Sequence, residues 1–524
     1  MPEISAPDLE YGLLLPFIVV FAAACLGVLV EALAPRALRY SLQLLVAFLG
    51  IILALVFTII NWAAGATAIV AMGSLALDGP TYFTWAALLL FGGISLLIFA
   101  ERKLEGNASA FAAQAASVPG TRSEQEAVAA RFEHTEVYPL ALFSLAGMMM
   151  FPAANDLVMM FVGLEMLSLP LYLLCGLARR RRLLSQEAAM KYFLLGSLSS
   201  AIFVYGMALL YGYAGSFGLG EIAAALQTSE KSDALLLAGM ALLAVGLLFK
   251  IGAVPFHAWT PDVYVGAPTP VTAFMATCTK VAAVAALLRV FFVALGGIRW
   301  DWQPMLIVVA LATMFVGSVL GMVQTDVKRM LAYSSIAHAG FILVAVVAAA
   351  QQSAGVTAGL SSVAAALFYL VAYSVATLGA FAVLTMIRVR GGESATLSGW
   401  AGLGRRAPVT AVVFSLFMLS FAGIPLTGGF IGKWAVFAAA WAGGDYWLVV
   451  AAVLISLVSA VIYFRVVVAM FFTEPAEDVQ RAEVVRPGWT TLVAIGIGVV
   501  ATAFLGIYPG PVLDLAASAG EFLR

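Results

Sequence analysis

Ionisable side chains inside long apolar runs are the residues of this sequence best placed to do chemistry. Lys250 ends the run LLAVGLLFK, Lys280 lies in VTAFMATCTKVAAV, Lys433 follows SFAGIPLTGGFIG, and Glu165 lies within FVGLEMLSLPLYLL. An ionisable group at the centre of a membrane helix costs about 2.5–3.5 kcal/mol on insertion scales, so such groups face the protein interior, pair or line water. A buried lysine beside a movable carboxylate can take up and release a proton, which is the chemistry of a proton relay.

Two histidines and one more lysine are further candidates for proton transfer. His338 lies within AYSSIAHAGFIL, and imidazole titrates near neutral pH, although a hydrogen-bonded interior histidine is the structural alternative. His257, in PFHAW, either takes part in proton entry or caps a helix. Lys191 lies four residues after Glu187 on an expected helix, where it forms a surface pair or reaches deep enough to join the relay.

Proline and glycine interrupt two of the apolar runs close to a lysine. Pro255 follows Lys250 and lacks an amide hydrogen, so it is expected to break that helix. A second break is expected in GIPLTGG, residues 423–429, just before Lys433. A break leaves backbone N–H and C=O groups without their helical hydrogen-bond partners. At membrane depth such groups are tolerated only inside protein or beside a water-filled cavity. The two breaks are five spans apart, which is an odd number, so we predict two inverted five-helix repeats.

The composition places these residues in a membrane protein. Of the 524 residues, 63% are hydrophobic and 10% are charged, whereas a soluble protein carries about 25% charged residues. A spanning helix needs about 20 mainly apolar residues, and the runs lack the alternation of barrel strands. We predict an all-α polytopic membrane protein with about fourteen transmembrane helices, of which helices 7 and 12 are broken. The expected spans are 12–33, 41–63, 82–100, 138–154, 157–178, 189–212, 234–255, 269–294, 303–322, 329–350, 360–387, 409–437, 447–472 and 489–509.

These spans divide the chain into four predicted parts. Residues 1–137 hold helices 1–3 and a hydrophilic loop, and residues 138–294 form the first repeat, helices 4–8. Residues 303–472 form the second, inverted repeat, helices 9–13, and residues 473–524 hold helix 14. The loop at 101–137 is predicted to be cytoplasmic, with a surface helix over 123–134.

Lysine and arginine predict the orientation, because cytoplasmic loops of membrane proteins carry an excess of both. Most loop cations lie in alternate loops, and we interpret the run Arg179–Arg182 as part of this topology signal rather than as a binding patch. The opposite loops and termini hold only Lys231, Arg299 and Arg524. Both termini are therefore expected on the external side, which requires an even number of helices. The cytoplasmic set is Arg36, Arg39, Arg102, Lys103, Arg122, Arg131, Arg179, Arg180, Arg181, Arg182, Lys328, Arg329, Arg388, Arg390, Arg405, Arg406, Arg481 and Arg486.

Several function classes are excluded by what the sequence lacks. It has no phosphate loop, nucleotide fingerprint or CxxC pair, and its three cysteines lie within apolar runs, so no cofactor or metal is expected in this chain. The net charge of −1 offers no basic face for nucleic acid. Arg289 and Arg465 lie within spans, and we interpret both as paired or snorkelling structural residues.

One long block of the sequence carries a family resemblance. Residues 249–280 resemble the signature of the antiporter-like membrane subunits of proton-pumping NADH–quinone oxidoreductase, respiratory complex I. Their sequence, FKIGAVPFHAWTPDVYVGAPTPVTAFMATCTK, is most similar to that of the subunit N family. GLEMLSLPLYLL, QEAAMKYFLLGS, DVKRMLAYSSIAHAGF and GIPLTGGFIGKW are similar to other blocks of that family. The resemblance covers residues 136–440.

This resemblance implies specific roles. Glu165 matches the glutamate of the fifth helix, Lys250 its partner lysine in the broken seventh, Lys280 the central lysine and Lys433 the lysine of the broken twelfth. His338 falls in the tenth-helix block of the central polar axis.

The resemblance also implies a function and a setting. The chain is expected to conduct protons across a bacterial inner membrane, beside another antiporter-like subunit and other membrane subunits. NADH, FMN, iron–sulfur clusters and quinone are expected in partner subunits only. The same charges would serve a subunit of a cation/proton antiporter, or a hydrogenase- or ferredoxin-linked relative of complex I, and these alternatives remain open from the residues alone.

Overall fold

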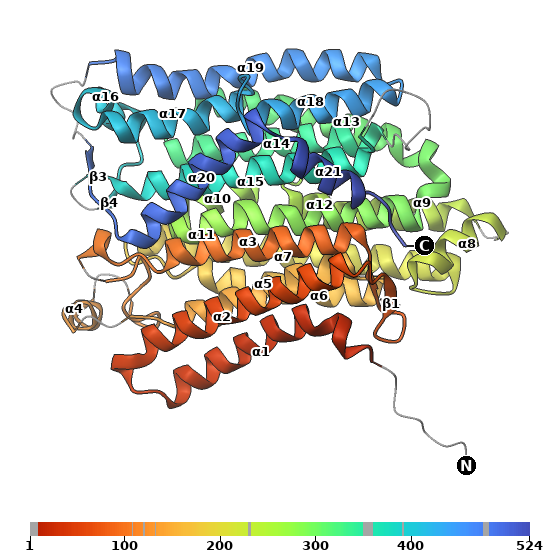
Figure 1. Ribbon diagram of the computed structural model, residues 1–524, viewed down its shortest axis with the longest axis horizontal. Coiled ribbons are helices and arrows are strands. Elements are labelled where there is room, and N and C mark those ends of the chain that lie inside the picture. Colours follow the sequence, from red (N-terminus) through yellow and green to blue (C-terminus); the bar gives the residue numbers. More distant parts are fainter. Residues whose placement is uncertain are drawn as a thin grey trace.

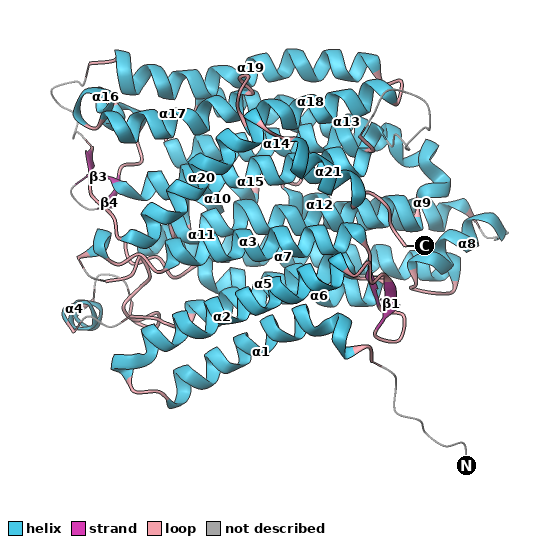
Figure 2. Ribbon diagram, viewed as in Figure 1, coloured by secondary structure: helices cyan, strands magenta, loops and turns pink. Residues whose placement is uncertain are grey.

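A computed structural model describes residues 9–106, 108–118, 121–130, 133–228, 232–348, 360–389, 392–474 and 482–523 of the chain. Within these residues the protein is helical almost throughout, with a few very short strands at its ends (Figure 2). The fold class predicted from the sequence, an all-α polytopic membrane protein, is confirmed. Some cations used to predict the orientation lie outside the described residues, namely Arg131, Lys231, Arg390, Arg481 and Arg524.

The N-terminal half is a series of long helices joined mostly by short connections. A small antiparallel hairpin pairs Ala68 with Leu77. The elements are α1 (Tyr11–Leu33), α2 (Arg36–Ala63), β1 (Ala68–Val70), β2 (Leu75–Leu77), α3 (Gly79–Phe99), η1 (Lys103–Glu105), α4 (Arg122–Ala129), α5 (Val137–Ala153), α6 (Leu157–Cys175), α7 (Arg182–Ala214), α8 (Leu219–Thr228), α9 (Asp233–Ile251), α10 (Trp259–Gly266), α11 (Thr269–Phe274), η2 (Met275–Thr279), α12 (Lys280–Arg289) and η3 (Val290–Ala294).

The C-terminal half repeats the pattern of long helices. A three-stranded sheet of order β4-β3-β5 lies at one end of it. Its elements are η4 (Gly296–Ile298), α13 (Arg299–Val323), α14 (Val327–Ala348), α15 (Ser362–Met386), β3 (Ile387–Val389), β4 (Gly392–Glu393), η5 (Leu397–Trp400), α16 (Leu403–Arg406), α17 (Pro408–Ala422), α18 (Gly428–Ala442), α19 (Tyr446–Phe472), β5 (Glu483–Val484), α20 (Trp489–Ile507) and α21 (Gly510–Ser518).

Length and composition make many of these helices fit to span a membrane. Among the described residues, twelve helices are long and apolar enough to cross, and α5 and α17 are shorter apolar helices. Every span expected from the sequence has a helical counterpart, but the count of fourteen stays a prediction. Helix α7 begins at Arg182, seven residues before the expected span. The polar stretch RLLSQEAAMK lowered the apparent hydropathy there, although most of its residues favour a helix.

Both predicted helix breaks are present. Helix α9 ends at Ile251, where Gly252 adopts a left-handed conformation with φ of 79°, and the chain resumes as α10 at Trp259. Helix α17 ends at Ala422 in the same way, with Gly423 at φ of 82°. Glycine adopts this conformation without steric cost, so it ends a helix while leaving its last carbonyls open to other donors.

The segment that carries Lys280 is continuous but irregular. Helices α11 and α12 are joined by the π-helical turn η2, and the span from Thr269 to Ala294 is buried inside the protein except at Phe292, which is partly exposed. Single π-turns inside α-helices widen the helix locally and occur frequently at functional sites. The turn η2 ends directly before Lys280, so it sets the direction in which this side chain projects.

The helices lie side by side along the longest axis of the molecule, and the connections gather at its two ends (Figure 1). One end holds the α1–α2 turn, α4, β3, β4 and α16, and the other holds β1 and α8, with α21 running toward it. The start of α1 lies at the same end as α21, so the described chain begins and finishes its crossings on one side.

Candidate functional site

Lys280 is buried at the centre of the helical bundle. It is only 4% exposed, and its Nζ donates to the carbonyl oxygen of Ser335 at 2.5 Å and to the Ser335 hydroxyl at 2.6 Å. Ser335 lies on the neighbouring helix α14, and the Tyr373 ring of α15 lies over the amine, with Nζ 5.2 Å from the ring centroid. Two neighbouring helices thus contact this lysine, and its partners are neutral oxygens and a π-face.

His338 lies one helical turn after Ser335 on the same face of α14. Its Nδ1 is 2.6 Å from the Tyr369 hydroxyl, and its Nε2 is 3.1 Å from the Tyr463 hydroxyl. The imidazole also contacts the Tyr373 ring, with centroids 4.7 Å apart. Since Tyr373 also lies over Lys280, the histidine and the central lysine share one aromatic wall.

Lys433 is positioned by the second helix break. Its Nζ donates to the carbonyls of Phe421 and Ala422 at 3.0 and 3.1 Å, and to the Ser456 hydroxyl at 2.8 Å. The two carbonyls belong to the last turn of α17, where the helix has no further amides to bond them. The negative end of a helix dipole favours a cation at this place. The helix break therefore leaves two carbonyls free to accept hydrogen bonds from the Lys433 amine.

Lys433 also approaches the helix that carries His338. Its Nζ lies 4.9 Å from the centroid of Phe341, which is one turn further along α14. The ring of Phe341 lies 6.0 Å from the imidazole of His338. The structure thus brings Lys280, His338 and Lys433 together around α14.

Lys250 and Glu165 are close in the structure but do not pair directly. Lys250 is 3% exposed, and its Nζ donates at 2.7 Å to the hydroxyl of Ser168, which lies one turn after Glu165 on α6. Glu165 accepts a hydrogen bond of 2.5 Å from the Ser200 hydroxyl of α7. Among the described residues the carboxylate and the amine form no ion pair, and each is hydrogen-bonded to a different serine instead of to the other.

The second group of expected residues lies apart from this row. Lys191 is 41% exposed at its side chain and forms ion pairs of 2.7 Å with Glu187 and with Asp262, which also pairs with Arg329 at 3.0 Å. Lys191 thus belongs to a network at the protein surface, in agreement with the surface-pair alternative.

His257 lies in the break between α9 and α10. Its backbone carbonyl accepts from the Thr260 amide at 2.9 Å, but the N-cap residue of α10 is Ala258 and no side chain caps this helix. Its Nδ1 is buried and, within the part of the chain that the structure describes, has no hydrogen-bond partner. No contact between this imidazole and the row of lysines is present among those residues.

Sequence reasoning missed a buried lysine and the hydroxyls that connect the row. Lys328 was assigned to a loop, yet it is 7% exposed and donates at 2.7 Å to the carbonyl of Ala267. Lys328 and Ser335 are seven residues apart, which places them on one face of a helix, and this spacing in DVKRMLAYSS is the signal that could have located it. Ser168 and Tyr463 carried no comparable signal, because serine and tyrosine occur throughout apolar helices.

Arg289 is held by a buried ion pair. Its guanidinium donates to both carboxylate oxygens of Asp78 at 2.8 and 2.9 Å and to the carbonyl of Pro152 at 2.6 Å. The side chain of Arg289 is fully buried and that of Asp78 nearly so. Of the two alternatives expected for Arg289, paired or snorkelling, the structure shows the paired one.

A family comparison matches the part of the chain that holds this site. Residues 154–459 match the family model described as NADH:quinone oxidoreductase/Mrp antiporter, transmembrane. The match includes all of the candidate residues, from Glu165 to Lys433. The helices and the buried row of amines are therefore those of an antiporter-type membrane subunit.

Full-length relatives narrow this class. The chain is 54% identical to NADH-quinone oxidoreductase subunit N of Nocardioides sp., over 99% of both chains. It is 54% identical to the subunit N of Rhodococcus opacus, over 99% of this chain and 98% of that one. This chain belongs to the NADH-quinone oxidoreductase subunit N family.

Solved structures agree with this assignment. A chain of respiratory complex I from Thermus thermophilus superposes with a TM-score of 0.74 at 33% identity, over 97% of this chain and 100% of that one. A chain of the Mrp complex from Dietzia sp. superposes with a TM-score of 0.79 at 22% identity, over 98% and 97%. At 22% identity, the likeness to the Mrp chain shows only that the two proteins share a fold.

Proposed function

We propose that this chain conducts protons across the membrane through Glu165, Lys250, Lys280, His338 and Lys433, as a subunit of a proton-pumping NADH–quinone oxidoreductase. Electron transfer takes place in partner subunits, which hold NADH, FMN, the iron–sulfur clusters and quinone. Membership of the subunit N family supports the assignment of this chain to a NADH–quinone oxidoreductase complex. The contacts of the three interior lysines support the proton route.

The observation that carries this proposal is the kind of partner each lysine has. All three amines are at most 5% exposed, and none has a carboxylate ion-pair partner among the described residues. Their partners are hydroxyls, backbone carbonyls and aromatic rings. A hydroxyl can either donate or accept a hydrogen bond, so it satisfies both the ammonium and the neutral amine. A residue held in this way can gain or lose a proton without leaving a buried ion pair broken.

The second half of the route contains a series of hydroxyl groups and an imidazole. Ser335 contacts Lys280, and Ser334 beside it is 2.7 Å from the Tyr463 hydroxyl, which in turn contacts His338. The imidazole can carry a proton on either nitrogen, so it can pass one between the two tyrosines. This path runs from the central lysine toward Lys433 along α14.

The first half is lined by aromatic residues. Tyr192 lies under Lys250 and stacks on Trp259, with centroids 4.8 Å apart, and Trp259 contacts Tyr264. The Tyr264 hydroxyl is 3.5 Å from that of Ser335, next to Lys280. The buried hydroxyl of Tyr192 has no partner among the described residues. Buried polar groups are normally hydrogen-bonded, so we place water between Lys250 and Lys280.

The predicted division of the chain fits this route. Residues 138–294 hold Glu165, Lys250 and Lys280, and residues 303–472 hold His338 and Lys433. We propose that the two parts are inverted repeats, each with one broken helix. A break supplies free carbonyls and room for water at membrane depth, as in transporters of this design.

We further propose that the end of the molecule with α4 and α16 faces the cytoplasm, and that both termini face the periplasm of a bacterial inner membrane. The arginines of the α1–α2 turn, of α4 and of α16 support this orientation, because all lie at that end (Figure 1). Partners along the bilayer are other membrane subunits of the complex, with an adjacent antiporter-like subunit among them.

Lys433→Gln tests the function at the far end of the row. Glutamine keeps a polar group near the carbonyls of α17 but cannot be protonated, so NADH-driven acidification of vesicles containing the whole complex should fall about a hundredfold. Lys103→Gln, at an exposed lysine, is the matched control and should pump normally. Normal pumping by Lys433→Gln would contradict the proposal, as would Na⁺ transport by wild-type vesicles that requires no NADH.

A further inference from the structure

Aromatic rings lie beside all three interior lysines. The amine nitrogens are 5.4, 5.2 and 4.9 Å from a ring centroid in the pairs Lys250 with Tyr192, Lys280 with Tyr373, and Lys433 with Phe341. A cation within about 6 Å of a ring centroid is attracted by the negative face of the ring. Because no carboxylate forms an ion pair with these amines among the described residues, the rings supply part of the electrostatic support that a counter-ion would give.

Tyr373 contacts more than the central lysine. Its ring lies beside the Lys280 amine and also contacts the imidazole of His338, with centroids 4.7 Å apart and the two planes inclined by 34°. Its hydroxyl lies close to the hydroxyls of Ser335 and Thr377. Since Ser335 accepts the hydrogen bonds of the Lys280 amine, Tyr373 lies against the lysine, its acceptor and the histidine at once.

Packing fixes the orientation of this ring. Tyr373 is 5% exposed, and its helix α15 packs against α14, which carries His338, and against the turn η2 before Lys280. The ring of Phe421 lies 5.8 Å from that of Tyr373, centroid to centroid. Side chains in a close-packed interior keep one orientation on average. Tyr373 therefore presents a constant π-face to the amine.

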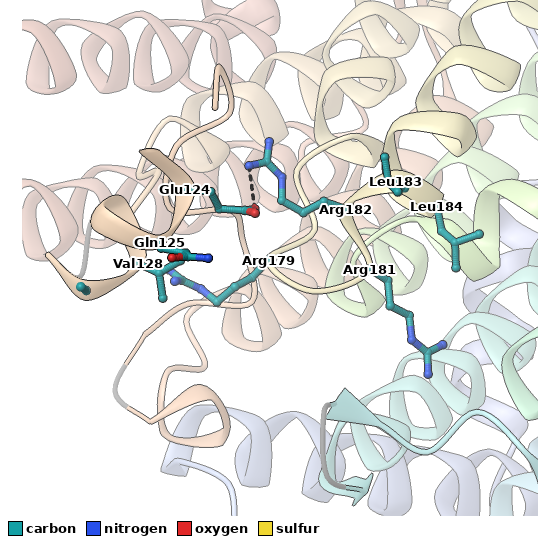
Figure 3. A pocket seen from close by; sticks show the side chains of 9 residues that line it. Glu124, Gln125, Val128, Arg179, Arg181, Arg182, Leu183 and Leu184 are labelled. Carbon is teal, nitrogen blue, oxygen red and sulfur yellow. Dashed lines mark hydrogen bonds and ion pairs between the residues drawn. The ribbon is translucent and has the colours of Figure 1, made fainter. Parts of the chain in front are cut away.

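The open cavity beside α4 shows no such convergence of side chains. It measures about 670 Å³ and lies at one end of the bundle, and none of the interior lysines lines it. Figure 3 shows Arg182 directed toward Glu124, whereas Arg181 points away from both. The arginines of this cavity thus make separate contacts, whereas the side chains around Lys280 share one another's contacts.

The groups around Tyr373 leave the Lys280 ammonium without an anion. The titratable groups of the neighbouring helices are the imidazole of His338 on α14, the amine of Lys433 on α18, and the hydroxyls of Tyr264 on α10 and Tyr463 on α19. Tyrosine and histidine are not anions at neutral pH. Burial disfavours the charged form of an amine, so the ring and the two Ser335 oxygens are what stabilise it here.

We propose that Tyr373 is a positioning residue of the proton route, whose ring stabilises the ammonium form of Lys280 and holds the imidazole of His338 beside it. This proposal rests on the proposed function and deepens it, because the ring then helps to set the pH range in which the central lysine carries a proton. The part played by the ring differs from proton transfer through the Tyr373 hydroxyl. Phenylalanine keeps the ring and removes the hydroxyl, so it separates the two roles.

Fluorination of the ring tests the proposal without changing the packing. In the whole complex, Tyr373 is replaced by phenylalanine and by pentafluorophenylalanine, whose fluorines withdraw electrons and remove the negative face of the ring. The initial rate of NADH-driven acidification is then measured as a function of pH. Tyr373→Phe should keep the wild-type pH profile. The fluorinated variant should lose pumping about one pH unit lower on the alkaline side, because the neutral amine is then favoured at lower pH.

Two controls make the result specific. Tyr205 is 61% exposed on α7, and the same fluorinated ring at this position should leave pumping unchanged. NADH oxidation with an artificial electron acceptor should have the same pH profile in every variant, which shows that electron transfer is unaffected.

Two results would overturn the proposal. One is an identical pH profile for phenylalanine and pentafluorophenylalanine at position 373, which would mean that the ring acts only by filling space. The other is a Tyr373→Phe variant that pumps as poorly as the fluorinated one, which would assign the role to the hydroxyl. In both cases, NADH-driven pumping by wild type and its loss in Lys433→Gln would still support the proposed function, so the two failures are distinguishable.

Discussion

Lys280→Arg is expected to lower NADH-driven proton pumping about a hundredfold, the contribution typical of a positioned proton-transfer group. Arginine keeps the positive charge and can donate to the Ser335 oxygens, but it does not lose its proton in proteins. The substitution therefore separates a proton-exchanging role from a purely electrostatic one. The measurement is the initial rate of acidification in vesicles that contain the whole complex.

Two controls accompany this variant. Lys103→Arg makes the same change at an exposed surface lysine and should pump at the wild-type rate. NADH oxidation with an artificial electron acceptor should be normal for Lys280→Arg, because we propose that the redox centres lie in other subunits. If Lys280→Arg pumped normally, a fixed positive charge would suffice at this position and the relay would be wrong there.

Asp78→Ala is expected to destabilise the fold by about 3–5 kcal/mol, because it leaves the Arg289 guanidinium buried without its counter-ion. Asp78 also accepts from the Thr81 amide at the start of α3 at 3.1 Å and from the Leu523 amide at 3.1 Å. One carboxylate thus joins α3, α12 and the end of the chain. Removing it leaves several donors unsatisfied at once.

Thermal exposure of buried cysteines measures this effect. Cys175 and Cys278 are fully buried, so a thiol reagent labels them only when the helices separate. In the assembled complex, Asp78→Ala should be labelled at a clearly lower temperature than wild type. Asp514→Ala, at an exposed aspartate of α21 near the same end, is the control and should match wild type. Equal transitions for the two variants would show that the ion pair does not hold the helices together.

Much of the fold could be predicted because the bilayer imposes a simple rule on the sequence. Each span needs a long apolar run, and glycine or proline marks where a helix must stop, as at Gly252 and Gly423. Short helical stretches with polar residues could not be predicted by this rule. The start of α7 at Arg182 and the eight-residue helix α10 depend on local hydrogen bonds and packing, which hydropathy does not report.

The candidate site was predictable in its charges but not in its contacts. Lysines such as Lys280 are conspicuous in an apolar run because of their insertion cost. Which atoms satisfy them depends on how the helices rotate against each other. Helical rotation places Ser168 rather than Glu165 against Lys250, and it buries Lys328 although its position near a loop suggested exposure.

The central claim, that the interior lysines pass protons in series, is tested most directly by comparing single and combined substitutions. Lys→Arg changes are made at positions 250, 280 and 433, singly and together, and the initial rate of NADH-driven acidification is measured in vesicles of the whole complex. Residues that act as a unit have strongly non-additive effects. The triple variant should therefore not pump more slowly than the slowest single variant. Losses that multiply from one substitution to the next, or single variants that pump at the wild-type rate, would contradict a series relay.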